Sequence, residues 1–221
     1  MYHSVQENLA SLNDLYVIDS RLFKDQMSFI KKNYKNILPF KELGIKDDEV
    51  TLSITFDDGF SDNLYIADPI LQDLNLPYTV FIATDFIKFN KEGFLSSLEL
   101  KELASKPNVD IGSHTATHPR LTTLSDYKVK EELRSSKHYL EDLLGKEINL
   151  FAYPHGDYDQ RIRDFVGEAG YTIARNSRFS SNNKITDRLL VSSSEIWNTD
   201  LIKVFQDKIN GHWDWIKYLQ N

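Results

Sequence analysis

Short apolar runs alternate with longer amphipathic stretches along this chain of 221 residues. The apolar runs are rich in β-branched and aromatic residues, which is typical of buried strands. These runs are VTLSITF (50–56), YTVFIAT (78–84), VDIGS (109–113), INLFAY (148–153) and YTIAR (171–175). The alternation predicts an α/β protein with a mostly parallel sheet and outer helices, either as a barrel or as a doubly wound sheet.

The stretches between the runs have helical spacing. They cover residues 62–74, 95–106 and 158–169, and the segment between Ser125 and Gly145. Ser125 can cap that last helix and Gly145 supplies its C-terminal stop, while Pro69 is expected to kink the first helix. No internal repeat and no Pro- or Gly-rich linker divides the chain, so residues 1–221 are expected to form a single domain.

Polar clusters follow three of the predicted strands. The clusters are Asp57-Asp58-Gly59, His114-Thr115-Ala116-Thr117-His118 and Pro154-His155-Gly156. Because ligands bind at the carboxyl ends of parallel strands in such folds, we expect the three clusters to meet at one site.

The residue types in these clusters are typical of metal chemistry. Two histidines four positions apart, His114 and His118, together with one carboxylate form a common ligand set for zinc or another divalent transition metal. Either Asp57 or Asp58 can be the third ligand, and the other aspartate would then be free to take a proton from water. Each motif alone has an ordinary alternative, because such pairs arise by chance and Asp-Asp-Gly and Pro-His-Gly are common turns. The combination at three strand ends favours a site.

Composition narrows the classes of partner. The chain is 41% hydrophobic and 27% charged, with a formal net charge of −7, which disfavours nucleic acid as a partner. It has no cysteine, so a metal must be held by His, Asp or Glu. No stretch approaches the roughly 20 apolar residues of a membrane span. The N-terminus lacks the features of a secretory signal, so a cytoplasmic location is expected for the sequence as written. MYHSV reads as the end of a strand already under way, and a missing upstream segment stays an alternative.

In this order, the clusters resemble the motifs of the polysaccharide deacetylases, also called carbohydrate esterase family four. Thr55–Gly59 resembles the first motif and Ser113–His118 the second. Phe151–Gly156 is similar to the third motif in its exopolysaccharide and biofilm-type variant, and Met1–Val5 and Glu168–Tyr171 also resemble that branch. The resemblance implies a distorted (β/α) barrel of about seven strands, with residues 1–221 as the catalytic domain.

The resemblance also implies a function. The chain would be a metal-dependent hydrolase that removes N-acetyl groups from the amino sugars of a poly- or oligosaccharide. Asp57 would be the general base, and the backbone N–H of His155 would stabilise the oxyanion. The ligands of a divalent metal, typically zinc, would be Asp58, His114 and His118. Tyr153 and Pro154, in the third motif, are expected to contact the carbohydrate substrate.

Two departures from the family pattern leave roles open. Ala152 takes the place of the arginine that orients the base, so another residue must hold Asp57, and Arg188 is a candidate. The late Leu-x-His motif that supplies the general acid is not evident. His3 and His155 are the candidates for that acid, whereas the surroundings of His212 do not fit and His138 is expected on the surface.

Other functions compete with the deacetylase. One is a catalytically inactive glycan-binding domain of the same fold, and another is a phosphoryl-transfer protein of the receiver type. Retention of both aspartates and both histidines favours the enzyme. Trp197, Trp213 and Trp215 could stack on sugar rings, although packing is the commoner role of tryptophan. The choice between N- and O-deacetylation, the glycan and the oligomeric state stay open.

Overall fold

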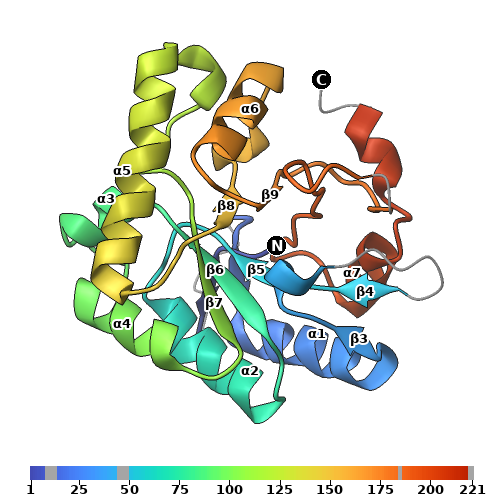
Figure 1. The fold of residues 1–221 in the computed structure, drawn as a ribbon. Helices are drawn as coiled ribbons and strands as arrows, with labels where there is room; N and C mark the ends of the chain where they lie inside the picture. The colour runs from blue at the N-terminus through green and yellow to red at the C-terminus, as the bar shows by residue number, and fades with distance from the viewer. Residues whose placement is uncertain (8–13, 44–49, 184–185, 219–221) are drawn as a thin grey trace.

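The computed structural model describes residues 1–7, 14–43, 50–183 and 186–218. At its centre lies a parallel sheet in the order β5-β6-β7-β8-β9 (Figure 1). The five strands are β5 (Ile54–Phe56), β6 (Tyr78–Ile82), β7 (Val109–Ser113), β8 (Leu150–Ala152) and β9 (Ile173–Arg175). Each lies within a predicted apolar run, so all five predicted strands are confirmed. The first run is interrupted, because its beginning forms β4 (Thr51–Leu52), which pairs with β3 (Asn36–Ile37).

The N-terminal segment lies beside the free edge of β5. The Tyr2 N–H donates to the Thr55 carbonyl at 2.8 Å, and the Asp57 N–H donates to the Tyr2 carbonyl at 3.0 Å. The chain then enters β1 (Ser4–Gln6), which pairs with β2 (Val17–Asp19) in a separate two-stranded sheet. The N-terminal segment therefore takes the place of a sixth strand at this edge of the sheet, although it is not a regular strand there.

Residues 188–196 cover the other edge of the sheet. Val191 forms a parallel bridge with Arg175 at the end of β9. The Ile196 N–H then donates to the Met1 carbonyl at 3.0 Å, which joins this segment to the N-terminal one. Five strands and two irregular segments thus close a ring, which confirms the distorted barrel of about seven strands and shows that the doubly wound alternative is wrong.

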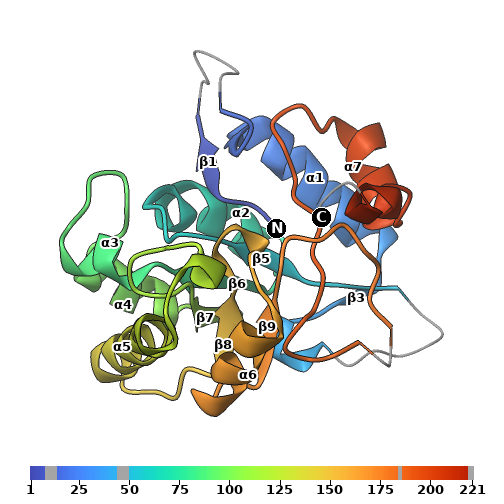
Figure 2. The same cartoon turned by 90° about the horizontal axis from the view of Figure 1, so that it is seen from above.

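Helices surround this barrel (Figure 2). They are α1 (Ser20–Asn33), a π-helix (Asn63–Ala67), α2 (Asp68–Asp73), α3 (Thr84–Lys88), α4 (Ser97–Ser105), α5 (Asp126–Leu144), α6 (Gln160–Glu168) and α7 (Ile202–Ile209). Short 3-10 turns occur at Phe40–Glu42, Leu121–Thr123, Pro154–Gly156 and Asp214–Tyr218. Gly145 ends α5 with a left-handed φ of 65°, as predicted, and the π-helix precedes α2 where Pro69 was expected to disturb the first helix. In the part of the chain that is described, none of the helices has the length and apolar character needed to cross a bilayer.

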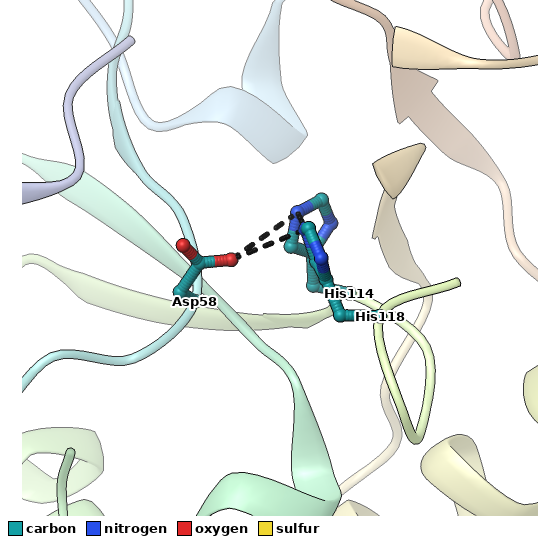
Figure 3. Close-up of side chains that lie close together, drawn as sticks. All are labelled: Asp58, His114 and His118. Carbon is teal, nitrogen blue, oxygen red and sulfur yellow. Dashed lines mark hydrogen bonds and ion pairs between the residues drawn. The ribbon is translucent and has the colours of Figure 1, made fainter. Parts of the chain in front are cut away.

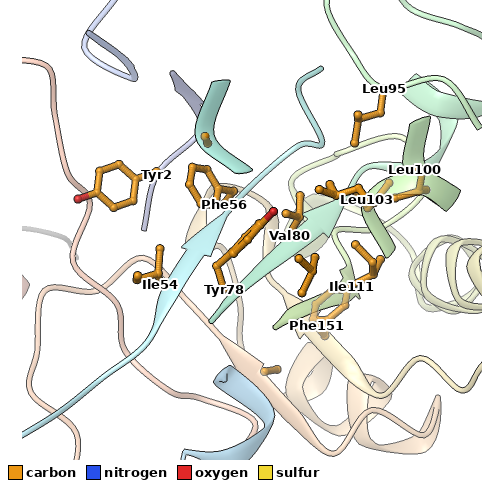
Figure 4. Packing of buried hydrophobic residues seen from close by; sticks show 14 of the residues in the cluster. Tyr2, Ile54, Phe56, Tyr78, Val80, Leu95, Leu100, Leu103, Ile111 and Phe151 are labelled. Atoms are coloured by element: carbon orange, nitrogen blue, oxygen red, sulfur yellow. The ribbon is translucent and has the colours of Figure 1, made fainter. Parts of the chain in front are cut away.

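The strands separate two layers of buried side chains. The larger layer lies between the sheet and the helices, where Phe56, Tyr78 and Val80 share a cluster with Leu100 and Leu103 of α4 (Figure 4). The smaller cluster is formed by Phe40, Phe81, Leu150, Ala152, Ile173 and Val191. Alternate residues of one strand go to opposite layers, as the two-residue period of a strand requires. The second cluster therefore fills the inside of the barrel.

Gly112 in β7 makes room for this inner cluster. A Cβ atom at this position would lie 2.5 Å from two ring carbons of Phe81 and 3.0 Å from Cβ of Leu150. Phe81 is fully buried, so its ring has little space to move away. We therefore expect Gly112→Ala to lower the free energy of unfolding by about 1–3 kcal/mol, as overpacking does in other cores. Urea unfolding measures this change.

The exposed α4 variant Lys101→Ala is the control, and its free energy of unfolding should stay within about 0.5 kcal/mol of the wild type. Equal unfolding midpoints for Gly112→Ala and the wild type would show that the Phe81 ring is not confined.

Candidate active site

A cavity of about 280 Å³ lies at the carboxyl ends of the barrel strands. Its wall contains all six residues predicted as catalytic or metal-binding, which are His3, Asp57, Asp58, His114, His118 and His155. A larger cavity of about 680 Å³ is lined by none of these six. We therefore take the smaller cavity as the candidate active site.

Asp58, His114 and His118 point toward one another in this cavity (Figure 3). Oδ1 of Asp58 lies 3.6 Å from Nε2 of His114 and 3.4 Å from Nε2 of His118. The two Nε2 atoms are 3.2 Å apart. One potential ligand atom from each residue lies within 4.8 Å of the other two, so the three side chains could hold one ion.

The electrostatics of the three side chains suit a cation. Nδ1 of His114 lies 2.8 Å from the Ala152 carbonyl, which can only accept, so Nδ1 carries the proton and Nε2 presents a lone pair to the cavity. Burial and the neighbouring His114 and His155 lower the pKa of His118 to about 3, so its ring is neutral as a ligand must be. Oδ1 of Asp58 is buried without a hydrogen-bond partner, and burial raises the pKa of this carboxyl. A divalent metal fits this donor set.

Asp57 is buried and paired with Arg175. Nη2 of Arg175 donates to Oδ1 of Asp57, and Oδ2 of Asp57 lies 3.7 Å from Nε2 of His114. Burial alone would raise the pKa of Asp57, but the Arg175 charge and hydrogen bond, with His114, hold it well below its usual range. Asp57 is therefore a carboxylate at neutral pH, and its Oδ2 is directed at the candidate metal ligands.

The suggestion that Arg188 orients Asp57 is wrong. Arg188 is exposed and its Nη1 donates to the Leu43 carbonyl at 3.1 Å. Arg175 has the role instead, and it lies directly opposite Ala152 in the register of β8 and β9. The guanidinium that the family pattern places at position 152 is thus supplied from the neighbouring strand. The sequence held a sign of this role, because the apolar run 171–175 ends in the charged residue Arg175, at the carboxyl end of a predicted strand.

His3 reaches the cavity from the N-terminal segment. Its ring centroid lies 4.7 Å from that of Tyr16, and its Nδ1 is buried without a hydrogen-bond partner. Burial lowers the pKa of His3, while the charges of Asp57 and Asp58 act in the opposite direction. His3 is therefore a histidine held close to two carboxylates, with one ring nitrogen not engaged by the protein.

His155 lies on the turn that follows β8. It adopts a left-handed φ of 58°, and its ring centroid is 4.5 Å from that of His118. The next residue, Gly156, also has a positive φ of 64°, and a Cβ atom there would lie 2.8 Å from the backbone N of Ser177. The close approach of Ser177 therefore requires glycine, and it fixes the turn that carries His155 into the cavity.

Tyr153 and Pro154 do not line the cavity, contrary to the predicted substrate contacts. The Tyr153 side chain is fully buried, and its hydroxyl donates to the Leu189 carbonyl at 2.9 Å. The reason is strand alternation, since Ala152 faces the inside of the barrel and Tyr153 therefore faces the outer layer with Phe151.

The three tryptophans also lie away from the cavity wall. Trp197 and Trp213 pack against the buried ammonium group of Lys208, at 3.5 Å and 4.9 Å from their ring centroids. Trp215 is 57% exposed. The aromatic residues that do line the cavity are Phe60 and Tyr16, which the sequence reading missed.

The two remaining histidines lie outside the site. His138, in α5, is near Glu141, and His212 lies 3.2 Å from Asp207. Neither lines the cavity, as their sequence surroundings indicated.

With this geometry established, comparison with known proteins identifies the family. The sequence pattern of the polysaccharide deacetylases matches residues 44–174, which is more than half of the chain and includes all three motifs. The chain belongs to the polysaccharide deacetylase family. This excludes the receiver-type alternative.

The individual relatives share less than a third of their aligned residues with this chain. The chain is 28% identical to YxkH of Bacillus subtilis (strain 168) over 179 residues, which cover 78% of this chain and 61% of that protein. It is 26% identical over 158 residues to the poly-beta-1,6-N-acetyl-D-glucosamine N-deacetylase of Staphylococcus epidermidis, covering 64% of this chain and 54% of the relative. The chain therefore spans less than two thirds of the length of either relative.

A solved polysaccharide deacetylase has the same fold. The crystal structure of BC0361 from Bacillus cereus superposes with a TM-score of 0.81 at 27% identity, covering 94% of this chain and 67% of that one. The barrel described above is thus the same fold as that of BC0361.

The Asp57–Arg175 pair yields a prediction about stability. Arg175→Met would leave a buried carboxylate unpaired, and we expect it to lower the free energy of unfolding by about 3–5 kcal/mol in chelated protein at pH 7. Because folding lowers the pKa of Asp57, the stabilisation exists above the pKa of the unfolded state and is lost as the pH falls. The difference between wild type and Arg175→Met should therefore shrink in acid. Denaturant titrations between pH 7 and pH 3 test this.

The double variant Asp57→Asn/Arg175→Met should recover part of the loss, whereas Arg188→Met should behave as wild type. A loss that is independent of pH and is not reduced by Asp57→Asn would contradict the pairing.

Proposed function

We propose that this chain is a metal-dependent deacetylase that removes N-acetyl groups from the amino sugars of a poly- or oligosaccharide. The observation that carries the proposal is the convergence of Asp58, His114 and His118 beside the ionised Asp57 in one cavity. Membership of the deacetylase family supports the reaction class. The relative named as a poly-beta-1,6-N-acetyl-D-glucosamine N-deacetylase supports the substrate class.

The metal set determines which chemistry is available. Two imidazoles and one carboxylate suit zinc, with positions left for water and substrate. A bound divalent metal supplies a Lewis acid for the acetyl carbonyl and lowers the pKa of a coordinated water. Asp58, His114 and His118 would hold the metal. Asp57 is not needed as a ligand, so its carboxylate is free to accept a proton from water.

Asp57 is proposed as the general base. Arg175 keeps it ionised, and its Oδ2 faces the metal ligands at 3.7 Å from Nε2 of His114. A carboxylate with so low a pKa binds a proton weakly, so it can act on water only where that water is already acidified. The same weakness lets Asp57 give the proton up again. It is proposed to pass this proton to His3, which then gives it to the leaving amine as the carbon–nitrogen bond breaks, so that the proton taken from water ends on the product amine.

The remaining roles concern the carbonyl oxygen and the leaving amine. The backbone N–H of His155, on the turn fixed by Gly156, is proposed to donate to the oxyanion. His3 is proposed as the acid that protonates the amine, because its Nδ1 has no partner in the protein and its ring lies on the cavity wall. His155 is the alternative acid.

The cavity itself indicates how the glycan is held. Its volume of about 280 Å³ lies just below the roughly 300–1,000 Å³ of sites for drug-sized molecules, which suits one sugar unit and its acetyl group. Phe60 and Tyr16 provide aromatic surface on which a sugar ring can stack. We propose that one sugar enters at a time and that the rest of the glycan lies outside.

The alternative of an inactive glycan-binding domain rested on two missing groups. Arg175 supplies a guanidinium to Asp57 from another strand, and His3 supplies a histidine at the cavity wall. These two observations favour the enzyme.

The first test separates the two aspartates. Asp57→Asn should abolish acetate release from N-acetylglucosamine oligomers while retaining the metal, because Asp57 is not a ligand in this scheme. His114→Ala should lose both, since it removes one of three ligands. Acetate release and metal content are measured on the same sample, before and after chelation, with His138→Ala as a histidine control.

Loss of metal from Asp57→Asn alone would mean that the roles of Asp57 and Asp58 are exchanged. Bound metal without acetate release from any acetylated glycan would favour the glycan-binding domain.

The second test identifies the acid. His3→Gln should lower kcat by about 100-fold or more, the range typical of lost proton transfer, with little change in KM. His155→Gln should lower kcat much less, because the proposed role of His155 uses its backbone. Steady-state kinetics on the same oligomers measure both variants, and the reverse order of effects would assign the acid to His155.

A further inference from the structure

The loop that carries both histidine ligands has an unfavourable backbone. Thr115 and His118 adopt left-handed φ values of 66° and 61°, which cost free energy in residues other than glycine. Such a loop keeps its shape only if neighbouring groups hold it. The separation of the two Nε2 atoms, and so the quality of the metal site, depends on those groups.

Thr115 holds the loop from within. Its Oγ1 donates to the His114 carbonyl at 2.5 Å and accepts from the His118 N–H at 3.1 Å. These bonds fix the local turn, but every atom in them belongs to the loop itself. They cannot fix the position of the loop relative to the barrel and to Asp58.

Glu132 of α5 ties the loop to the scaffold. Its Oε2 accepts from the backbone N–H groups of Ala116 and Thr117, both at 2.9 Å, and its Oε1 accepts from the Thr117 hydroxyl at 2.7 Å. Three donors of one loop thus converge on a single carboxylate. Hydrogen bonds to an ionised acceptor are about twice as strong as those between neutral groups.

The helix that carries Glu132 is itself fixed. Val129, Leu133 and Ser136, on either side of Glu132 in α5, are buried. The Ser136 hydroxyl lies 2.8 Å from that of Ser113, the residue before His114. Glu132 is only partly buried, so α5 packs without it. Two carbonyls of the loop, those of Thr115 and Ala116, also accept from the backbone N–H groups of Thr84 and Asp85. Removing the Glu132 carboxylate should therefore loosen the loop without detaching it, and leave the helix in place.

We infer that Glu132 is a positioning residue that sets the affinity of the metal site by anchoring the loop 114–118. This rests on the proposed metal-dependent function. Partners behind metal ligands typically change metal affinity by about 10- to 100-fold when they are lost. We expect Glu132→Ala to weaken zinc binding by that factor, with little change in the melting temperature of the metal-free protein.

The experiment measures the zinc dissociation constant of the metal-free chain by competition with a chromophoric chelator. Glu132→Gln retains an acceptor oxygen and should recover most of the affinity. Thr117→Val removes only one of the three hydrogen bonds and should weaken zinc binding a few-fold, so it tests the anchor even if Glu132→Ala does not fold. Glu131→Ala is the matched control, because this neighbouring carboxylate is exposed on α5 and bonds to Tyr127 and Lys128.

The outcomes separate this inference from the function on which it rests. A wild-type chain that binds no zinc or other divalent metal would overturn the proposed function. Tight zinc binding by the wild type, with the same dissociation constant for Glu132→Ala and Thr117→Val, would overturn the role of Glu132 alone. Weaker binding with an equally large fall in melting temperature would also overturn it, because Glu132 would then be a general support of the fold.

Discussion

The site depends on a single buried ion pair, between Asp57 and Arg175. It joins the end of β5 to the end of β9, the two edges of the five-stranded sheet. Nη1 of Arg175 also lies 3.1 Å from Sδ of Met1 and 3.4 Å from Oγ of Ser193, so the guanidinium contacts both irregular segments that close the barrel. A buried charge is tolerated only with its partner. Closure of the barrel therefore brings Asp57 together with the guanidinium that keeps it ionised.

The pair also shows how a departure from the family pattern at one position can be compensated from the neighbouring strand. Ala152 and Arg175 are partners across β8 and β9, and both face the inside of the barrel. An alanine leaves the space that a long side chain from the neighbouring strand needs. The proposed reaction uses a guanidinium against Asp57, and in this chain β9 provides it in place of position 152.

Local patterns predicted the strands and the three motifs because both depend on short-range information. The apolar runs mark β5 to β9, and the residues after them form the cavity wall. Closure of the barrel was not predictable in this way, since residues 188–196 have no strand pattern and meet Met1 only through the fold. Arg175 and Tyr153 show the same limit, because the layer that a strand-end side chain faces depends on the register.

The distances in sequence between these partners have a consequence for assembly. All three proposed metal ligands lie between positions 58 and 118, whereas the pair that holds the proposed base spans 118 positions. Contacts of long sequence separation form late, because the intervening chain must be ordered first. A chain in which β9 and the segment after it have not docked already contains the three proposed ligands, but its Asp57 lacks Arg175. For the proposed enzyme, metal content and turnover would therefore report on different stages of folding, because the ligand set can be complete before Asp57 has met Arg175.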